Sequence, residues 1–159
     1  MKIRSSALGF TLMELILVIV LLSILSLFAA SRFMGSGSFS AYALQERVIS
    51  VIRQVQVNRM QSNVEKPDDN FRLQVSSSCV GSVAACALIG SAQDARSDVV
   101  IDKSAKFSVI SGAANTINFN LLGNPVSGAV NILIEDKHGR SRCQVEINTQ
   151  GYVSKGTCS

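Results

Sequence analysis

The sequence predicts an α+β protein in which a long N-terminal helix packs on a small antiparallel β-domain. An apolar run with a single charge extends from Phe10 to Ala30, and apolar residues with a helical period follow over 40–64. From Phe71 onward, apolar and polar residues alternate as in half-buried strands. The 159 residues have room for one small domain and an appendage. A content of 47% hydrophobic and 16% charged residues excludes a disordered chain.

The first predicted element is an apolar helix over 10–34, which forms the membrane-spanning half of the long helix. The run FTLMELILVIVLLSILSLFAA, from Phe10 to Ala30, contains one charged residue, Glu14. A helix of this length spans about 30 Å, the hydrocarbon thickness of a bilayer. Lys2 and Arg4 precede the run, so the positive-inside rule predicts a cytoplasmic N-terminus and an exported remainder. A secretory signal peptide is the alternative, but its apolar core has only about 7–15 residues.

A plain membrane anchor does not explain why the apolar run contains the charged residue Glu14. A carboxylate at this depth costs about 2.5–3.5 kcal/mol on insertion scales and normally has a partner. No Lys, Arg or His follows within two helical turns. The partner is therefore interfacial water, another chain, or a charge created by processing. Cleavage between Gly9 and Phe10 would supply the amine of Phe10, and its pairing with Glu14 would set the register of stacked helices.

The second predicted element is an amphipathic helix over 35–66. One stripe of it is apolar: Leu44, Val48, Val51, Ile52 and Val55. Polar and charged residues occupy the other side: Gln45, Glu46, Arg47, Arg53, Gln54, Asn58 and Arg59. We expect the stripe to pack on the sheet and the polar side to be solvated. Pro67 begins the loop that follows, and Gly35 and Gly37 either break the long helix or form a spacer.

The third predicted element is the antiparallel β-domain over 67–159. Five segments alternate apolar and polar residues: 71–75, 106–110, 116–120, 130–134 and 143–147. We expect about six or seven short strands against one helix, which is an α+β arrangement. Asp136 to Gly139 forms a hairpin turn between two of these strands, and His138 is a residue of that turn.

The four cysteines favour two disulfides in this β-domain. Cys79 and Cys86 are seven residues apart, and Cys143 and Cys158 are fifteen apart. Of the three possible connectivities, we favour Cys79–Cys86 with Cys143–Cys158, because each bond closes a local loop. The alternative is a zinc site, but the chain has no CxxC spacing and only one histidine. We therefore predict no metal and no cofactor.

The segment Gly9-Phe10-Thr11-Leu12-Met13-Glu14, after a short basic leader and before an apolar helix, resembles the class III signal of type IV prepilins and pseudopilins. In that family a prepilin peptidase cuts after the glycine and methylates the new N-terminus. The resemblance implies that residues 1–9 are a cleaved leader peptide, that Phe10 is N-methylated and that Glu14 guides assembly. Many relatives carry a proline before an Arg-Phe pair, where this chain has Ser31.

The C-terminal half resembles the closing strands of minor pilins and pseudopilins of the GspH/FimT group. The segments that carry this resemblance are Ile117 to Gly123, Arg142 to Ile147 and Gly151 to Val153. The whole chain looks closest to an MshC-type minor pilin of mannose-sensitive haemagglutinin (MSHA) pili. This resemblance implies the pilin fold and a minor structural subunit of a type IV pilus that supports pilus biogenesis and surface adhesion.

The implied partners are the major pilin, other minor pilins, the prepilin peptidase, the inner-membrane platform protein and the assembly ATPase. The subunit would cross the inner membrane once, with its β-domain in the periplasm, and would then enter a surface pilus or a periplasmic pseudopilus. The first alternative is a GspH-like minor pseudopilin of type II secretion, which carries the same signal.

A second alternative is a DNA-binding minor pilin of competence, using Lys137, Arg140, Arg142 and Lys155. The net charge of +4 includes Lys2 and Arg4, so we do not expect nucleic acid as a partner. No catalytic constellation is present in the sequence, and we predict that the protein is not an enzyme.

Overall fold

A computed structural model of the chain describes residues 11–33, 37–112 and 114–159. The chain separates into two compact units, Met1–Ser36 and Gly37–Ser159. The two long helices precede the antiparallel sheets along the chain, which confirms the predicted α+β class.

Unit 1 contains helix α1, Leu12–Phe33. Most of its residues are straight-chain and branched aliphatics with good to moderate helix propensity, and the helix contains neither glycine nor proline. The sequence predicted a membrane-spanning helix over 10–34. Across residues 11–33, 37–112 and 114–159, however, no helix meets the length and hydropathy that crossing a membrane demands.

Unit 2 begins with helix α2, Gly37–Gln61, and continues with two four-stranded antiparallel sheets. The first sheet has the order β3-β2-β1-β5, with strands Val99–Ile101, Cys79–Ser82, Arg72–Ser76 and Thr116–Asn118. The second sheet has the order β4-β6-β7-β8, with strands Ala105–Ser111, Val130–Asp136, Arg142–Ile147 and Val153–Cys158. Two short helices, α3 (Val83–Cys86) and α4 (Ser91–Asp94), follow β2.

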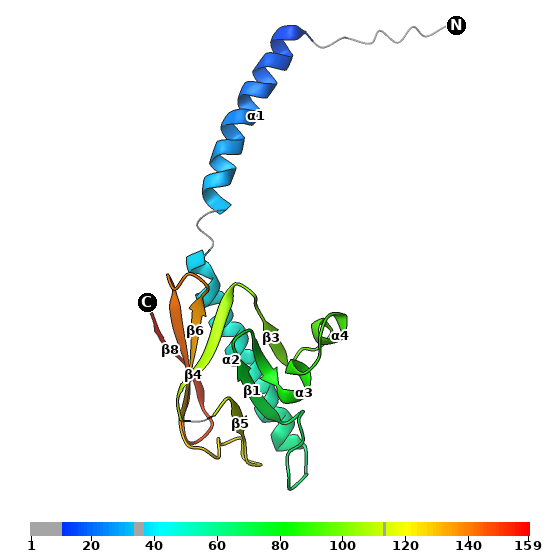
Figure 1. Cartoon of the computed structure of the whole chain (residues 1–159), viewed down its shortest axis with the longest axis vertical. Coiled ribbons are helices and arrows are strands. Elements are labelled where there is room, and N and C mark those ends of the chain that lie inside the picture. Colours follow the sequence, from blue (N-terminus) through cyan, green and yellow to red (C-terminus); the bar gives the residue numbers. More distant parts are fainter. Residues whose placement is uncertain (1–10, 34–36, 113) are drawn as a thin grey trace, which may run out of the picture. The chain divides into compact units, whose positions relative to one another are not determined.

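Helix α2 is the shared element of the core, because it packs on strands of both sheets (Figure 1). The predicted stripe is buried, with Leu44, Val48, Val51, Ile52 and Val55 exposed by 5% or less. The alternating residues of β6 bury Ile132 and Ile134 against it, and Phe107 of β4 is among the largest fully buried side chains. Burial of large aliphatic and aromatic side chains contributes about 1.5–3 kcal/mol each.

The five predicted strands are all present, but the structure adds β2, β3 and β8 to them. These three strands are short or interrupted by small residues, as in Cys79-Val-Gly-Ser82, so that their alternation is weak in the sequence. The Asp136–Gly139 hairpin is confirmed: β6 pairs with β7, and the Gly139 amide donates to the Asp136 carbonyl at 2.9 Å. His138 is an exposed residue of this turn, as predicted, and its backbone amide donates to the Asp136 carboxylate.

The predicted amphipathic helix over 35–66 is shorter in the structure. Helix α2 starts at Gly37 and ends at Gln61, and Asn63 then adopts a left-handed conformation with φ 49°. Asparagine tolerates this conformation better than most residues, so the helix stops before Pro67 is reached. Of the two glycines expected at the break, Gly37 is the first residue of α2 and Gly35 lies outside the described residues.

The prediction that the polar side of α2 is solvated is wrong for two of its residues. Gln45 is only 4% exposed and Arg59 only 3% exposed, and Gln56, which the sequence did not single out, is 6% exposed. Their nitrogen atoms donate to backbone carbonyls of the strands and turns, so these polar groups are buried with partners. Gln45 donates to Gln144 (2.6 Å) and Gly156 (3.3 Å), Gln56 to Gly123 (2.9 Å) and Gly151 (2.8 Å), and Arg59 to Phe119 (3.0 Å).

Candidate functional site

Helix α1 begins with a hydrogen-bonded cap at Thr11. The Glu14 amide donates to the Thr11 hydroxyl at 3.3 Å and to the Thr11 carbonyl at 3.1 Å, and the Leu15 amide donates to the same carbonyl at 3.2 Å. Thr11 followed three residues later by Glu14 is the sequence of a capping box. The acidic side chain in the first turn also interacts favourably with the helix dipole. The capping side chain is that of Thr11, a role that the sequence analysis missed, although the T-x-x-E spacing carried the signal.

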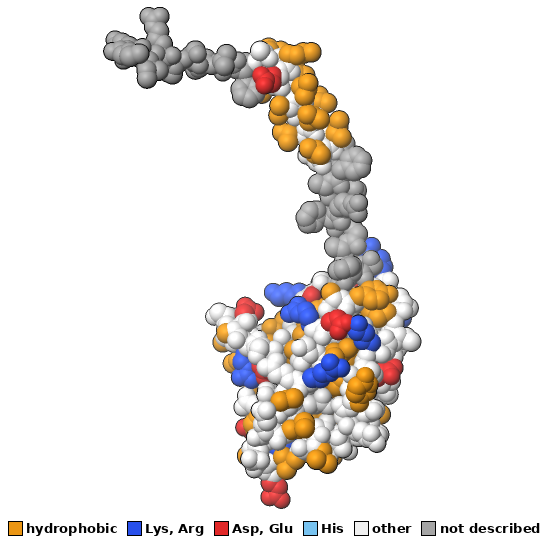
Figure 2. Space-filling view, turned by 180° about the vertical axis from the view of Figure 1, so that it is seen from behind, with side chains coloured by type: hydrophobic (Ala, Val, Ile, Leu, Met, Phe, Trp, Pro, Cys, Tyr) orange, Lys and Arg blue, Asp and Glu red, His pale blue; other side chains and the backbone are white. Residues whose placement is uncertain are grey.

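The carboxylate of Glu14 is exposed and makes no ion pair with any described residue. Figure 2 shows a single red group among the orange side chains of the described part of α1, and Glu14 is the only acidic residue in the sequence of that part. A carboxylate beside apolar side chains is stable only with water or with a partner charge. Its charge is therefore available to another group.

The described part of α1 exposes apolar side chains on every side. Large hydrophobic residues from Leu12 to Leu25 are exposed by 40–77% (Figure 2). The positions include consecutive residues, such as Leu15 to Leu22, so they cover the full circumference of the helix. A helix that is apolar all round is buried in its working environment. The surface of α1 therefore requires an apolar partner.

Two serines within α1 are adapted to such an environment. The Ser23 hydroxyl donates to the Ile19 carbonyl and the Ser26 hydroxyl to the Leu22 carbonyl, both at 2.7 Å. These bonds satisfy the hydroxyl donors within the helix, so that neither needs water or a neighbouring chain. Ser23 and Ser26 thus do not oppose burial of the run.

The processing residues predicted from the sequence, Gly9 and Phe10, lie outside the described residues. The cleavage position and the methylation of Phe10 stay predictions. The predicted partner of Glu14, the amine of Phe10, also lies outside the described residues. Of the three predicted processing and assembly residues, the structure therefore places only Glu14.

Both favoured disulfides are present in unit 2. Cys79 is bonded to Cys86, with the two Cα atoms 6.0 Å apart, and Cys143 to Cys158, with the Cα atoms 4.1 Å apart. The second bond joins residues that face each other in the pairing of β7 with β8, so it fixes the last strand to the sheet. Since all four thiols are in disulfides, the alternative of a zinc site built on them is wrong.

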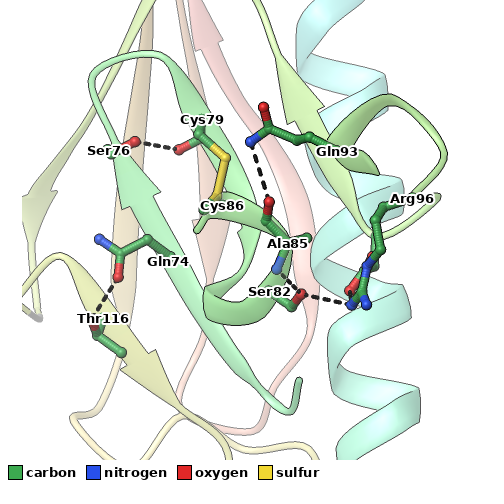
Figure 3. Close-up of a disulfide and its surroundings, with 10 residues drawn as sticks. Gln74, Ser76, Cys79, Ser82, Ala85, Cys86, Gln93, Arg96 and Thr116 are labelled. Atoms are coloured by element: carbon green, nitrogen blue, oxygen red, sulfur yellow. Dashed lines mark hydrogen bonds and ion pairs between the residues drawn. A yellow bond between two sulfur atoms is a disulfide. The ribbon is translucent and has the colours of Figure 1, made fainter. Parts of the chain in front are cut away.

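A polar cluster surrounds the first disulfide (Figure 3). The Ser82 hydroxyl accepts from the Ala85 amide at 3.1 Å and caps α3, and Gln93 donates to the Ala85 carbonyl at 3.2 Å. Arg96 binds both carboxylate oxygens of Asp98, at 2.8 and 2.7 Å, and also donates to Ser82 at 3.2 Å.

Asp98 is buried in this cluster, and opposing effects act on its carboxyl. Burial raises the pKa of Asp98, but hydrogen bonds from Arg96 and Ser82 and the charge of Arg96 lower it, so that the net pKa is below its ordinary value. A buried carboxylate with a bidentate arginine partner holds the α3–α4 segment on the sheet. This is a structural role.

Three of the four basic residues considered for DNA binding lie beside acidic side chains. Arg142 pairs with Glu135 at 3.0 Å, and Lys155 pairs with Glu46. Arg140 lies 3.9 Å from the Asp136 carboxylate. Neutralised cations bind phosphate weakly, so the structure brings no strong DNA-binding footprint together at these positions.

Comparisons with known proteins gave one likeness to a solved structure. The chain is similar to the crystal structure of the type IV minor pilin FimU of Pseudomonas aeruginosa, with 9% identity and a TM-score of 0.49. The match covers 77% of this chain and 92% of that chain. No protein-family model matches the chain, and no curated protein matches it significantly.

Proposed function

We propose that this chain is a structural subunit of a filament of the type IV pilin class, assembled through its N-terminal helix. The observation that carries the proposal is the exposed, fully apolar circumference of α1 with Glu14 in its first turn. In a filament, the α1 helices of many subunits would bury one another. Unit 2, whose core is already closed around α2, would face outward.

In this proposal the chain is made as a precursor, cut between Gly9 and Phe10, and N-methylated on Phe10. Before assembly it resides in the inner membrane, with unit 2 in the periplasm. An assembly ATPase and a platform protein then add it to a filament. Its lateral partners would be the major pilin and other minor pilins. The specific assignment is a minor subunit of an MSHA-type pilus that supports pilus biogenesis and adhesion, without an enzymatic activity.

Processing and filament membership are tested together by mass spectrometry of filaments sheared from the native cell. We expect a peptide that begins at N-methylated Phe10, in low abundance beside a major pilin. A chain that retains residues 1–9 in every cell fraction would overturn the proposal. A Gly9 substitution is the matched control, because it should block cleavage and leave the leader attached.

The role of the Glu14 charge is tested by comparing Glu14→Gln with the unchanged chain. Glutamine keeps the T-x-x-E/Q capping pattern and a similar volume but removes the carboxylate. If the charge pairs with the Phe10 amine, Glu14→Gln and Glu14→Ala should both leave the subunit processed and folded, yet reduce its incorporation into filaments. Normal incorporation of Glu14→Gln into filaments would show that assembly does not need the Glu14 charge.

The second candidate function is a minor pseudopilin of type II secretion. The same apolar helix and the same Glu14 support it, because both machines would use α1 in the same way. The two are distinguished by location: processed chain in surface filaments favours the pilus, and processed chain confined to the cell envelope, with loss of protein export on deletion, favours the pseudopilus.

A further inference from the structure

The two sheets of unit 2 end in four edge strands, β3 and β5 in the first sheet and β4 and β8 in the second (Figure 1). An edge strand presents unpaired amide and carbonyl groups, which proteins normally cover. Three edges are covered in part: Arg53 donates to the Val153 carbonyl of β8 at 2.8 Å, the Phe107 amide of β4 donates to the Ser77 carbonyl at 3.2 Å, and the Val126 amide donates to the Asn118 carbonyl of β5 at 2.9 Å. Strand β3 is the remaining edge.

The backbone of β3 directs two residues toward its free side. The Ser82 amide at the end of β2 donates to the Asp98 carbonyl at 3.0 Å. Because backbone groups in an antiparallel pair face the partner strand at every second residue, Asp98 and Val100 bond to β2. The amide and carbonyl groups of Val99 and Ile101 therefore point away from β2. Within residues 11–33, 37–112 and 114–159, β3 pairs with β2 alone, and no other hydrogen bond binds these outward groups.

A surface hollow runs along this free edge. Val100 is 1% exposed and belongs to the core that α2 covers, so Val99 and Ile101 point to the opposite face of the sheet. A hollow of about 140 Å³ nevertheless touches Val99, Ile101 and Arg47 of α2. Since these side chains belong to opposite faces, the hollow passes beside the edge of β3. A second hollow of about 270 Å³ lies between α2 and β3.

The helix side of this edge carries a positive charge without a partner. Arg47 is exposed and lines both hollows, and none of the ion pairs within the described ranges involves it. Arg96 also lines both hollows, but its charge is neutralised by Asp98. Asp94 of α4 lines the smaller hollow and is not part of the hollow between α2 and β3. An acidic group on the helix side would therefore complement Arg47.

This charge disfavours a second copy of the chain as the occupant of the edge. Two β3 strands could pair in antiparallel fashion about a two-fold axis at Val100. The axis would place the Arg47 side chains of both copies on the same face of the joined sheet. Like charges brought together across a strand pair are destabilising. The edge is better suited to a different strand that carries an acidic residue.

We propose that the free edge of β3 binds an extended segment of another protein as an additional strand, with an acidic side chain opposite Val100 and next to Arg47. The outward amides and carbonyls of Val99 and Ile101 bond to the backbone of that segment, and its flanking apolar side chains lie beside theirs. In strand addition, backbone bonds supply the affinity and alternate side chains supply the specificity. This interaction is separate from assembly through α1 and does not depend on it.

The test is a titration of the full chain in detergent, followed by amide NMR, with a blocked heptapeptide of the sequence Ser-Thr-Val-Glu-Val-Thr-Ser. We expect saturable shifts and slowed hydrogen exchange at the amides of Val99 and Ile101. The Val100 amide should keep its exchange rate, because it is already bonded to β2. The same peptide with both valines N-methylated keeps the side chains but lacks the backbone donors, and it should not bind. A peptide with lysine in place of glutamate should bind about threefold more weakly or worse.

Two variants of the chain test the charge and the backbone separately. Arg47→Glu should reverse the preference, so that the lysine peptide binds more tightly than the glutamate peptide. Lys137→Glu is the matched control, because it makes the same change of charge in the exposed β6–β7 turn and should leave the preference unchanged. Ile101→Pro removes an outward amide at a position where an edge strand tolerates proline, and it should weaken both peptides about fivefold. All three variants should keep the melting temperature of the unchanged chain.

Four results would overturn the proposal. The first is the absence of saturable binding to the folded chain, and the second is equal binding of the N-methylated peptide, which needs no variant to fold. The third is an unchanged preference for glutamate in Arg47→Glu. The fourth is slow exchange of the Val99 and Ile101 amides before any peptide is added, which would show that the edge is already paired, as in a dimer of this chain.

Discussion

The two long helices differ in which side chains they bury: α1 exposes apolar side chains, whereas α2 buries polar ones beside its apolar stripe. In α1, side chains from Leu12 to Leu25 are almost all apolar and all of them are exposed. In α2, the side chains of Gln45, Gln56 and Arg59 are polar and buried. The difference lies in where each helix finds its partners. Every buried polar group named in α2 has acceptors within its own unit, whereas the side chains of α1 that the structure describes, up to Ser26, are all exposed.

This contrast assigns different tasks to the two helices. Helix α2 is the internal support of the fold, because its apolar stripe and its long polar side chains both bind the sheets of unit 2. The hydrophobic effect favours removal of apolar surface from water, so the exposed apolar surface of α1 favours association with apolar partners. Substitutions in the two helices should therefore separate folding from association.

The largest expected effect on folding comes from Arg59→Met in α2. Methionine preserves much of the aliphatic volume but leaves three carbonyl groups and the Ser62 hydroxyl without their donor. We expect a loss of about 4 kcal/mol in the free energy of unfolding of unit 2. Urea unfolding followed by circular dichroism measures it. The matched control is Arg47→Met on the exposed side of α2, which should change stability by less than about 0.5 kcal/mol.

Removal of the disulfide between β7 and β8 should have the next largest effect. The double substitution Cys143→Ala with Cys158→Ala opens a loop of separation 15 and should cost about 3 kcal/mol in the chain-entropy description. Removal of the bond between Cys79 and Cys86, with separation 7, should cost about 2 kcal/mol. The same urea titration compares them. A larger loss for the shorter loop would contradict the entropic ranking.

The fold was predictable from the sequence where side-chain periodicity is strong. The alternation in 130–134 and 143–147 and the turn from Asp136 to Gly139 identified a hairpin that the structure contains. The three missed strands lack this signal. In β8, for example, the alternation of Val153-Ser-Lys-Gly-Thr-Cys158 contains only one large aliphatic residue, and the strand depends on its pairing with β7 and on the disulfide.

The buried side of α2 was not predictable from polarity alone. Arg59 follows Val55 by four residues and Ile52 by seven, so its spacing places it on the face of the apolar stripe, and only its polarity assigned it to the solvated side. The carbonyl groups that accept from Gln45 and Arg59 are about 100 and 60 residues away along the chain. The N-terminal motif was readable from local spacing, but of its residues only those from Thr11 onward are described.

A smaller loss in the free energy of unfolding is expected at acidic pH, where Asp98 of the Arg96–Asp98 pair becomes protonated. The pKa of Asp98 is lowered in the folded protein, because hydrogen bonds and the Arg96 charge outweigh the opposing effect of burial. Its contribution is therefore complete above the unfolded pKa of about 3.9 and is lost as the pH falls through the lower folded pKa. The unfolding free energy should decline in this acidic range, and the decline should be shallower in Asp98→Asn.

Arg96→Gln should flatten the same acidic slope, since Arg96 is the main source of the lowered pKa. The combination of Arg96→Gln and Asp98→Asn should add little to either change in slope, because the two residues form one interaction. If the change in slope of the double variant equalled the sum of the two single changes, the pH dependence would arise from other carboxyl groups.

The smallest expected effect on folding, and the sharpest test of the contrast, is Ile19→Lys in α1. Ile19 is 54% exposed, so the unfolding free energy of unit 2 should change by less than about 0.5 kcal/mol. Association should respond in the opposite way, because a lysine among packed apolar helices would be buried without an anion. After detergent removal, we expect the unchanged chain to sediment as large assemblies and the variant to form markedly fewer of them.

The matched control for Ile19→Lys is Val57→Lys, which places the same charge at an apolar position of α2 that is 46% exposed. It should alter neither the stability of unit 2 nor its sedimentation. If Ile19→Lys destabilised unit 2 as strongly as Arg59→Met, α1 would belong to the folding core and the contrast would fail. If both lysine variants sedimented like the unchanged chain, the apolar circumference of α1 would not drive association. Loss of association in Ile19→Lys alone, with folding intact, assigns assembly to α1 and folding to α2.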